Sequence, residues 1–285
     1  MLFKNIGTQL LKVLEDNVDN ENKQWLLLKI EDIVQTESTK DLYLTYSLIS
    51  TKIKSDKELS LLLDDKELKA YLEVQQANLQ EIARIYLLCK VLRAKEDFFK
   101  PKVANIIEVA DKSELETFLK FLVLLPHPEN YIVQAVEALR TNISTVFDAI
   151  ALNNPYPALY FNEQQWNQMY LKAAFMQQNL NDIVQVEKRG NKELARIISD
   201  YAHERWAASR EIDPSFWRPV SNFINEKLLE DMKRLFSSDN MAERKAAGLC
   251  CYYSNSSKAK ELLNGFPELA KEIENGSISW SNIKG

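Results

Sequence analysis

The chain has 285 residues, of which 46% are hydrophobic and 27% charged, a composition that excludes a disordered protein. Its formal net charge of −5 at pH 7 argues against a nucleic-acid-binding protein, because phosphate backbones require a basic face. The length is sufficient for a substantial buried core, and we expect a single domain over residues 1–285.

Cysteine usage and the N-terminal segment both predict a protein of the cytoplasm. The three cysteines show no CxxC spacing, so they predict buried free thiols rather than a zinc site or a disulfide framework. The N-terminus turns acidic by Glu15 and Asp16 and lacks the apolar stretch of a signal peptide. The longest apolar run, near residues 121–125, is far shorter than the roughly 20 residues that span a bilayer. We therefore expect no transmembrane segment.

Residues 1–125 are rich in Leu, Lys and Glu, contain no proline before Pro101, and are predicted to be helical. Residues 67–93 carry apolar side chains at steps of three and four, which predicts one long amphipathic helix. Three pairs have the spacing of a capping box at a helix start: Ser55–Glu58, Asp64–Glu67 and Asp111–Glu114.

Two further helix starts are predicted at proline, at His127-Pro128 and at Asp213-Pro214. Between them, residues 153–157 (Asn-Asn-Pro-Tyr-Pro) break a helix next to several aromatic residues. This loop is either the rim of a pocket or a packed corner.

The predicted fold class is all-α, with about a dozen helices and no strand-like alternation. Small residues recur in helix centres, which favours helical hairpins stacked as a HEAT-like α-solenoid; a compact irregular helical bundle is the alternative. Within the one domain we distinguish residues 1–125, an Arg- and aromatic-rich core at residues 126–218, and C-terminal HEAT-like helices at residues 219–285.

The segment 126–218 differs sharply in composition from the rest of the chain. It holds six of the ten arginines but only three of the 26 lysines, together with three of the five tryptophans and both histidines. Arginine grips carboxylates or phosphates with two bonds and tolerates burial, so the segment is typical of a pocket or an interface. Buried structural ion pairs between helices are the alternative. The candidate ligand-binding residues are Arg140, Arg196, Arg205, Arg210, Tyr160, Trp166, Trp206, His127 and Glu129.

A helix is predicted from about Asn191, and it places Arg196, Asp200, His203 and Arg210 on one face. Its simplest interpretation is an exposed ion pair between Arg196 and Asp200.

His203 is the candidate general acid or base, with Asp200 or Glu204 as the carboxylate that tunes it. A metal site would require His127 and His203 to converge with a carboxylate. Neither histidine has a second histidine at ligand spacing, so we predict no metal and no cofactor.

Residues 127–175, which begin HPENYIVQAVEALR, and residues 194–220, which begin LARIISDYAHERW, resemble the EboA family. The resemblance implies a bacterial protein encoded in a gene cluster for the biosynthesis or transport of a secondary metabolite, a cyclitol-type or prenyl-linked precursor. It also implies pathway proteins as partners, among them a membrane prenyltransferase. It implies no catalytic residues for this chain.

Three hypotheses remain open. In the first, the chain is a non-enzymatic accessory protein that binds an anionic small molecule or a pathway partner through residues 126–218. In the second, it is an isomerase, lyase or transferase that uses His203. In the third, residues 126–218 are purely structural.

Overall fold

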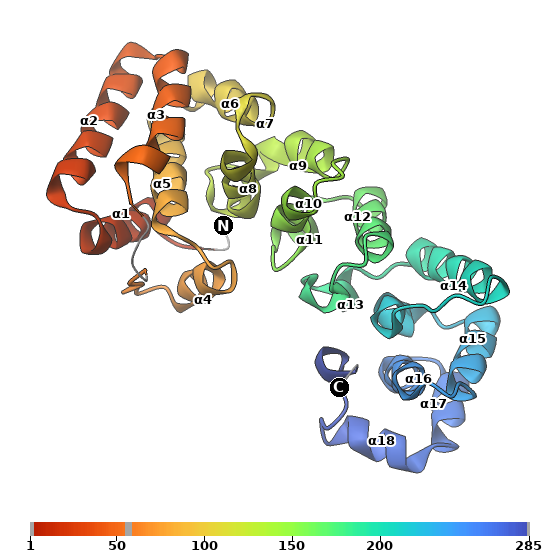
Figure 1. Ribbon diagram of the computed structural model, residues 1–285. Coiled ribbons are helices and arrows are strands. Elements are labelled where there is room, and N and C mark those ends of the chain that lie inside the picture. Colours follow the sequence, from red (N-terminus) through yellow and green to blue (C-terminus); the bar gives the residue numbers. More distant parts are fainter. Residues whose placement is uncertain (1–2, 55–58, 284–285) are drawn as a thin grey trace. The chain divides into compact units, whose positions relative to one another are not determined.

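The computed structural model describes residues 3–54 and 59–283, and these contain helices and connecting turns but no strand (Figure 1). The all-α fold predicted from the sequence is therefore confirmed. The described residues form eighteen α-helices and five 3-10 helices, which is more than the predicted dozen.

The chain divides into two compact units, Met1–Tyr160 and Phe161–Gly285, which are described separately. The boundary lies inside the segment 126–218. The single domain and the HEAT-like stacking stay predictions.

Helices of the first unit pack around α5. The bounds are α1 (Ile6–Asn17), α2 (Asn20–Thr36), α3 (Thr39–Lys52), α4 (Lys66–Val74), α5 (Leu79–Ala94), α6 (Glu96–Ala104), α7 (Ile106–Val109), α8 (Lys112–Lys120), η1 (Leu122–Leu124), η2 (Pro128–Tyr131), α9 (Ile132–Ala138), α10 (Ser144–Ala151) and α11 (Tyr156–Tyr160). Because α5 contacts α1, α2, α3, α6 and α8, it is buried on all sides. Its buried Arg84 donates to the Tyr46 carbonyl (3.1 Å) and lies 3.8 Å from the Glu114 carboxylate.

The prediction of one helix over residues 67–93 is wrong. The chain leaves the helical conformation at Gln76, whose φ is +50°, and α5 starts afresh with a capping box between Asn78 and Glu81. Gln75, the polar interruption of the apolar stripe, donates to the Asn153 carbonyl (2.8 Å). Gln75 thus lies at the break between α4 and α5, and its side chain bonds to a loop outside both helices.

The predicted helix starts are mostly correct. The Asp111–Glu114 capping box is present, whereas the residue that caps α4 is Asp65 rather than Asp64. Ser55–Glu58 lies outside the described residues. His127-Pro128 and Asp213-Pro214 both start helices, but of the 3-10 type.

The second unit has α16 at its centre. The bounds are α12 (Glu163–Phe175), η3 (Leu180–Asp182), α13 (Val186–Arg189), α14 (Lys192–Ala207), η4 (Pro214–Phe223), α15 (Glu226–Phe236), α16 (Met241–Tyr253), α17 (Ser257–Asn264), α18 (Pro267–Glu274) and η5 (Trp280–Asn282). α16 contacts η4, α15, α17 and α18. A Cβ atom at Gly248 would lie 2.7 Å from Leu269, so the small residue lets α18 approach closely.

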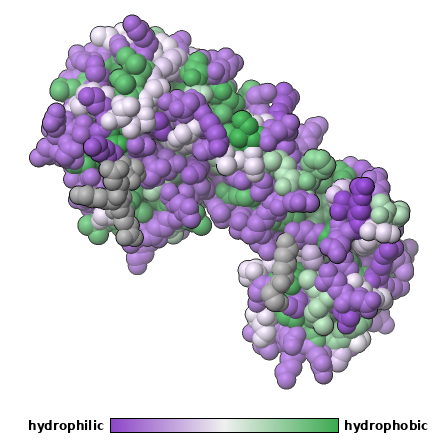
Figure 2. Space-filling model, in the orientation of Figure 1, coloured by the Kyte–Doolittle hydropathy of each residue, from purple (hydrophilic) through white to green (hydrophobic). Residues whose placement is uncertain are grey.

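Hydrophilic side chains cover most of the face seen in Figure 2, with small apolar patches between them. No helix in the described part of the chain is long and apolar enough to cross a membrane. The three cysteines are buried and free, as predicted, and burial raises the pKa of the Cys89 thiol to about 12.

The loop at residues 153–157 forms a packed corner. Asn154 is 1% exposed, and its amide donates to the carbonyls of Ala149 (2.9 Å) and Leu119 (3.1 Å). Its side-chain oxygen accepts from the Tyr156 N–H (2.9 Å). One side chain thereby satisfies three buried main-chain groups.

We expect Asn154→Ala to lower the free energy of unfolding by about 2–4 kcal/mol, because it leaves these buried groups without partners. Urea denaturation measures the effect. Asn130→Ala is the control in the same unit, since Asn130 is exposed and makes one long bond to Glu96 (3.4 Å). Equal losses in the two variants would contradict the role given to the corner.

Candidate functional site

Helix α14 positions most of the candidate residues of the second unit, and it begins where the sequence predicted. Asn191 caps it by accepting from the Leu194 N–H (2.9 Å) and also donates to the Asn167 side chain on α12 (2.7 Å). One side of α14 is buried, with the residues Leu194, Ala195, Ile198, Ser199 and Ala202. The other faces of α14 are therefore the ones available to a ligand.

The helix ends at Ala207, before the last predicted residue of its polar face. Ser209 adopts a left-handed conformation (φ +53°), and the Arg210 N–H donates to the Arg205 carbonyl (2.9 Å). The prediction that Arg210 continues the helical face of Arg196 and His203 is therefore wrong.

Arg196 takes part in an exposed charge network. It donates to Glu193 (2.7 Å) and to Asp200 (2.6 Å), and Asp200 also accepts from Lys227 of α15 (2.6 Å). The hydrogen bond from Lys227 lowers the pKa of Asp200, and that from Arg196 lowers the pKa of Glu193. The interpretation of Arg196–Asp200 as an exposed ion pair is confirmed.

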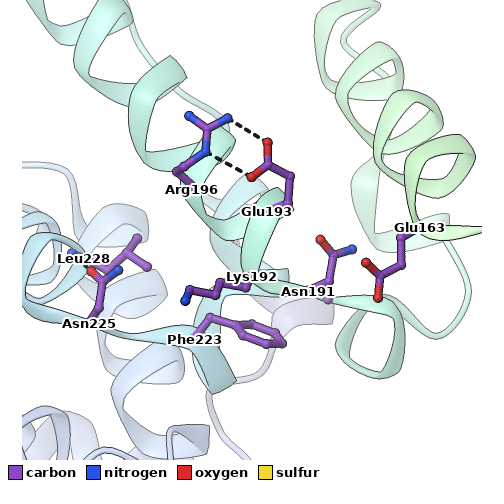
Figure 3. A pocket seen from close by; sticks show the side chains of 9 residues that line it. Glu163, Asn191, Lys192, Glu193, Arg196, Phe223, Asn225 and Leu228 are labelled. Carbon is purple, nitrogen blue, oxygen red and sulfur yellow. Dashed lines mark hydrogen bonds and ion pairs between the residues drawn. The ribbon is translucent and has the colours of Figure 1, made fainter.

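Arg196 also lines a pocket of about 530 Å³ where α14 and α15 begin (Figure 3). The figure shows Lys192 and Phe223 at this pocket, and the Arg196 guanidinium bonded to Glu193. The charge of Arg196 is therefore already neutralised by its own helix.

His203 pairs with a carboxylate that the sequence analysis did not single out. Its Nε2 lies 2.7 Å from Oδ1 of Asp231 on α15, and Ser199 donates to the other oxygen of that carboxylate (2.6 Å). Asp231 is 2% exposed, whereas the His203 side chain is 51% exposed. A pattern could have revealed it, because Asp231 is the one acid in the apolar stripe of α15, between Leu228 and Met232.

A larger pocket, of about 800 Å³, lies at the end of α14, and we call it the Arg205 pocket. Its aromatic wall is Tyr201 against Phe216, with ring centroids 5.3 Å apart. Arg205 donates from Nε (3.1 Å) and Nη2 (2.7 Å) to the Glu211 carbonyl, and Arg210 lines the same pocket. The carboxylates of Glu204, Glu211 and Asp213 also line it.

Five of the six arginines of segment 126–218 fall into two groups, and the sixth, Arg189, donates to the Phe161 carbonyl (2.7 Å). Arg140, Arg196 and Arg218 form ion pairs with Glu137, Glu193 and Glu187, respectively. Arg205 and Arg210 form none within the described residues, where Arg205 is held by a carbonyl alone. The Arg205 pocket is therefore lined by two arginines for which the described residues provide no carboxylate in direct contact.

The two candidate tryptophans have different surroundings. Trp166 is fully buried, and Arg189 lies over its ring at 5.0 Å. Trp206 is half-buried between Trp217 (5.8 Å) and the Arg234 guanidinium (4.2 Å). It lines a pocket of about 490 Å³ that shares Arg210 with the Arg205 pocket.

The remaining candidates belong to the first unit. His127 lies 3.3 Å from Glu129 and 3.8 Å from Glu96, Arg140 pairs with Glu137, and Tyr160 packs on Tyr156 at 4.8 Å. Within the described residues, no three His, Cys, Asp or Glu side chains are grouped so that they could hold a metal ion.

Comparison with protein families identifies a family for most of the chain. Residues 6–221 match the family described as metabolite traffic protein EboA. The chain belongs to the EboA family. The family predicted from residues 127–175 and 194–220 is thus confirmed. No curated protein and no solved structure matches the chain. The EboA match includes the arginines and the aromatic wall of the Arg205 pocket, but Asp231 lies beyond it.

For this EboA-family chain we expect Asp231→Ala to lower the free energy of unfolding by about 2–3 kcal/mol. The substitution removes the acceptor of the buried Ser199 hydroxyl and of His203. Asp200→Ala is the matched control, since Asp200 bonds only in the exposed network, and its effect should be much smaller. Urea denaturation compares the two, and a loss as large in the control would argue against the Asp231 network.

Proposed function

We propose that this chain is a non-enzymatic accessory protein that binds a small metabolite with an anionic group in the Arg205 pocket. The observation that carries the proposal is the pair of guanidinium groups, Arg205 and Arg210, that line one pocket without an ion-pair partner in the described part of the chain. A main-chain carbonyl orients Arg205 and leaves its full charge for a ligand.

The acidic residues that line the Arg205 pocket further restrict the chemical class of the ligand. Glu204 and Glu211 can accept hydrogen bonds and repel a bare anion, so a ligand that also offers them donors should bind more tightly than one with an acidic group alone. A head group with an acidic group and several hydroxyl groups satisfies both kinds of side chain, and its apolar ring face would pack on Tyr201. A cyclitol-type or other polyhydroxy acid fits this description.

The family description, metabolite traffic, supports a protein that binds a compound without converting it. We infer that the chain acts in the cytoplasm and passes a precursor between the proteins of a secondary-metabolite pathway. A membrane prenyltransferase is one such partner, implied by the family resemblance.

Native mass spectrometry of the protein purified gently from its own host tests the proposal. We expect a small retained mass on the wild type and its loss from the double variant Arg205→Ala/Arg210→Ala. The mass should persist in Arg140→Ala, because Arg140 is exposed and paired with Glu137.

A wild-type chain without any small mass would contradict the binding role, as would a mass retained by the double variant. Thermal denaturation of the same proteins separates binding from folding, since the proposal expects the melting temperature of the ligand-free chain to stay within a few degrees of wild type.

A second candidate function, acid–base catalysis, is favoured by the His203–Asp231 pair. A buried carboxylate at 2.7 Å fixes one imidazole nitrogen, while the His203 side chain stays half exposed to solvent. This is how a positioned general base is held, with Asp231 as the orienting residue in place of Asp200 or Glu204.

His203→Asn separates the two functions. Under the accessory role, we expect the variant to retain the output of the pathway in the native host, with His127→Asn as the control. Abolished output, together with an unchanged melting temperature and with normal output from the control, would favour the enzyme.

A further inference from the structure

A second cavity continues the Arg205 pocket along α14. It measures about 480 Å³, and four of its seven lining residues also line the Arg205 pocket. The shared residues are Ala174, Phe175, Tyr201 and Phe216. The two cavities therefore share a wall, and we infer that they are the two ends of one site; we call the second end the apolar groove.

The walls of the apolar groove are two rows of hydrophobic side chains. Leu171 and Phe175 are four residues apart on α12, and Ile197 and Tyr201 are four residues apart on α14, so each pair lies on one helix face. Phe216, which is 1% exposed, completes the lining from η4. Lys172 is the one charged residue of this lining.

Phe175 is the most exposed large hydrophobic side chain of the described residues, at 78%. A phenyl ring in water is unfavourable, and here it stands at the junction of an apolar groove with a pocket that contains two arginines. A bound hydrocarbon chain would remove part of this ring, together with Leu171 and Ile197, from water.

We propose that the ligand is an amphiphile, with its acidic head in the Arg205 pocket and a hydrocarbon chain in the apolar groove. The inference rests on the proposed function, which supplies the acidic head group, and it adds the chemical class of the rest of the ligand, a hydrocarbon chain. Charge complementarity assigns the two ends, because Arg205 and Arg210 line only the polar end and Leu171 and Ile197 only the apolar end.

Isothermal titration calorimetry with a series of n-alkyl phosphates, from ethyl to decyl phosphate, tests the inference on the full chain below the concentrations at which micelles form. Glycerol phosphate is the probe without a chain. We expect affinity to rise about threefold to fourfold per methylene until the groove is filled, and then to level off.

Two double variants test which part of the ligand binds at each end of the site. Phe175→Ser/Ile197→Ser should flatten the dependence on chain length, whereas Arg205→Ala/Arg210→Ala should weaken all members of the series by a similar factor. Val133→Ser is the control, because Val133 is comparably exposed (74%) and lies on α9 of the first unit. It should leave the dependence unchanged.

The outcomes distinguish the inference from the proposed function. Equal affinity for glycerol phosphate and for every alkyl phosphate would overturn the amphiphile and leave head-group binding intact. Absence of binding by all probes, together with a bare wild type in native mass spectrometry, would overturn both. Binding to vesicles of phosphatidylglycerol and phosphatidylcholine, but not to monomeric alkyl phosphates, would overturn the inference in favour of adsorption to a lipid surface.

Discussion

Burial of one side of α14 is the constraint on which the candidate site depends. Leu194, Ile198 and Ala202 lie in the core of the second unit, and this fixes the rotation of the helix about its axis. Tyr201 and Arg205 must then line the Arg205 pocket, while Trp206 lines its neighbour. Hydrophobic burial thus determines on which side of α14 the charged groups lie.

The polar contacts of α14 also fix how far the helix is displaced along its own axis relative to α12 and α15. The Asn167–Asn191 exchange ties its start to α12, and the buried Asp231 carboxylate ties its middle to α15 through Ser199 and His203. Directional bonds of this kind tolerate less sliding than an apolar face does. The pocket at the end of α14 is accordingly built on an element that is held at both its start and its middle.

The sequence predicted whatever depends on local pattern. The all-α class, the start of α14 at Asn191 and the Asp111 capping box follow from periodicity and caps, and the family follows from two stretches of sequence. The end of α14 could not be predicted, because the left-handed turn at Ser209 carries no glycine to mark it. The apolar stripe of α15 marks Asp231 as unusual, but its partners could not be predicted, since they are 28 and 32 residues away and only tertiary packing brings them together.

The difference between local sequence pattern and tertiary contacts also explains why an excess of arginine did not by itself identify a site. Composition treats Arg196 and Arg205 alike, but a carboxylate and a carbonyl do different things to a guanidinium. Glu193 and Asp200 neutralise Arg196 and return it to the role of a surface ion pair. The Glu211 carbonyl fixes the direction of Arg205 through two hydrogen bonds but brings no negative charge of its own. Arg205 is therefore an oriented cation in a pocket that adjoins an apolar groove. In the proposed complex, the acidic head of the ligand accepts hydrogen bonds from this cation, and the hydrocarbon chain covers the groove.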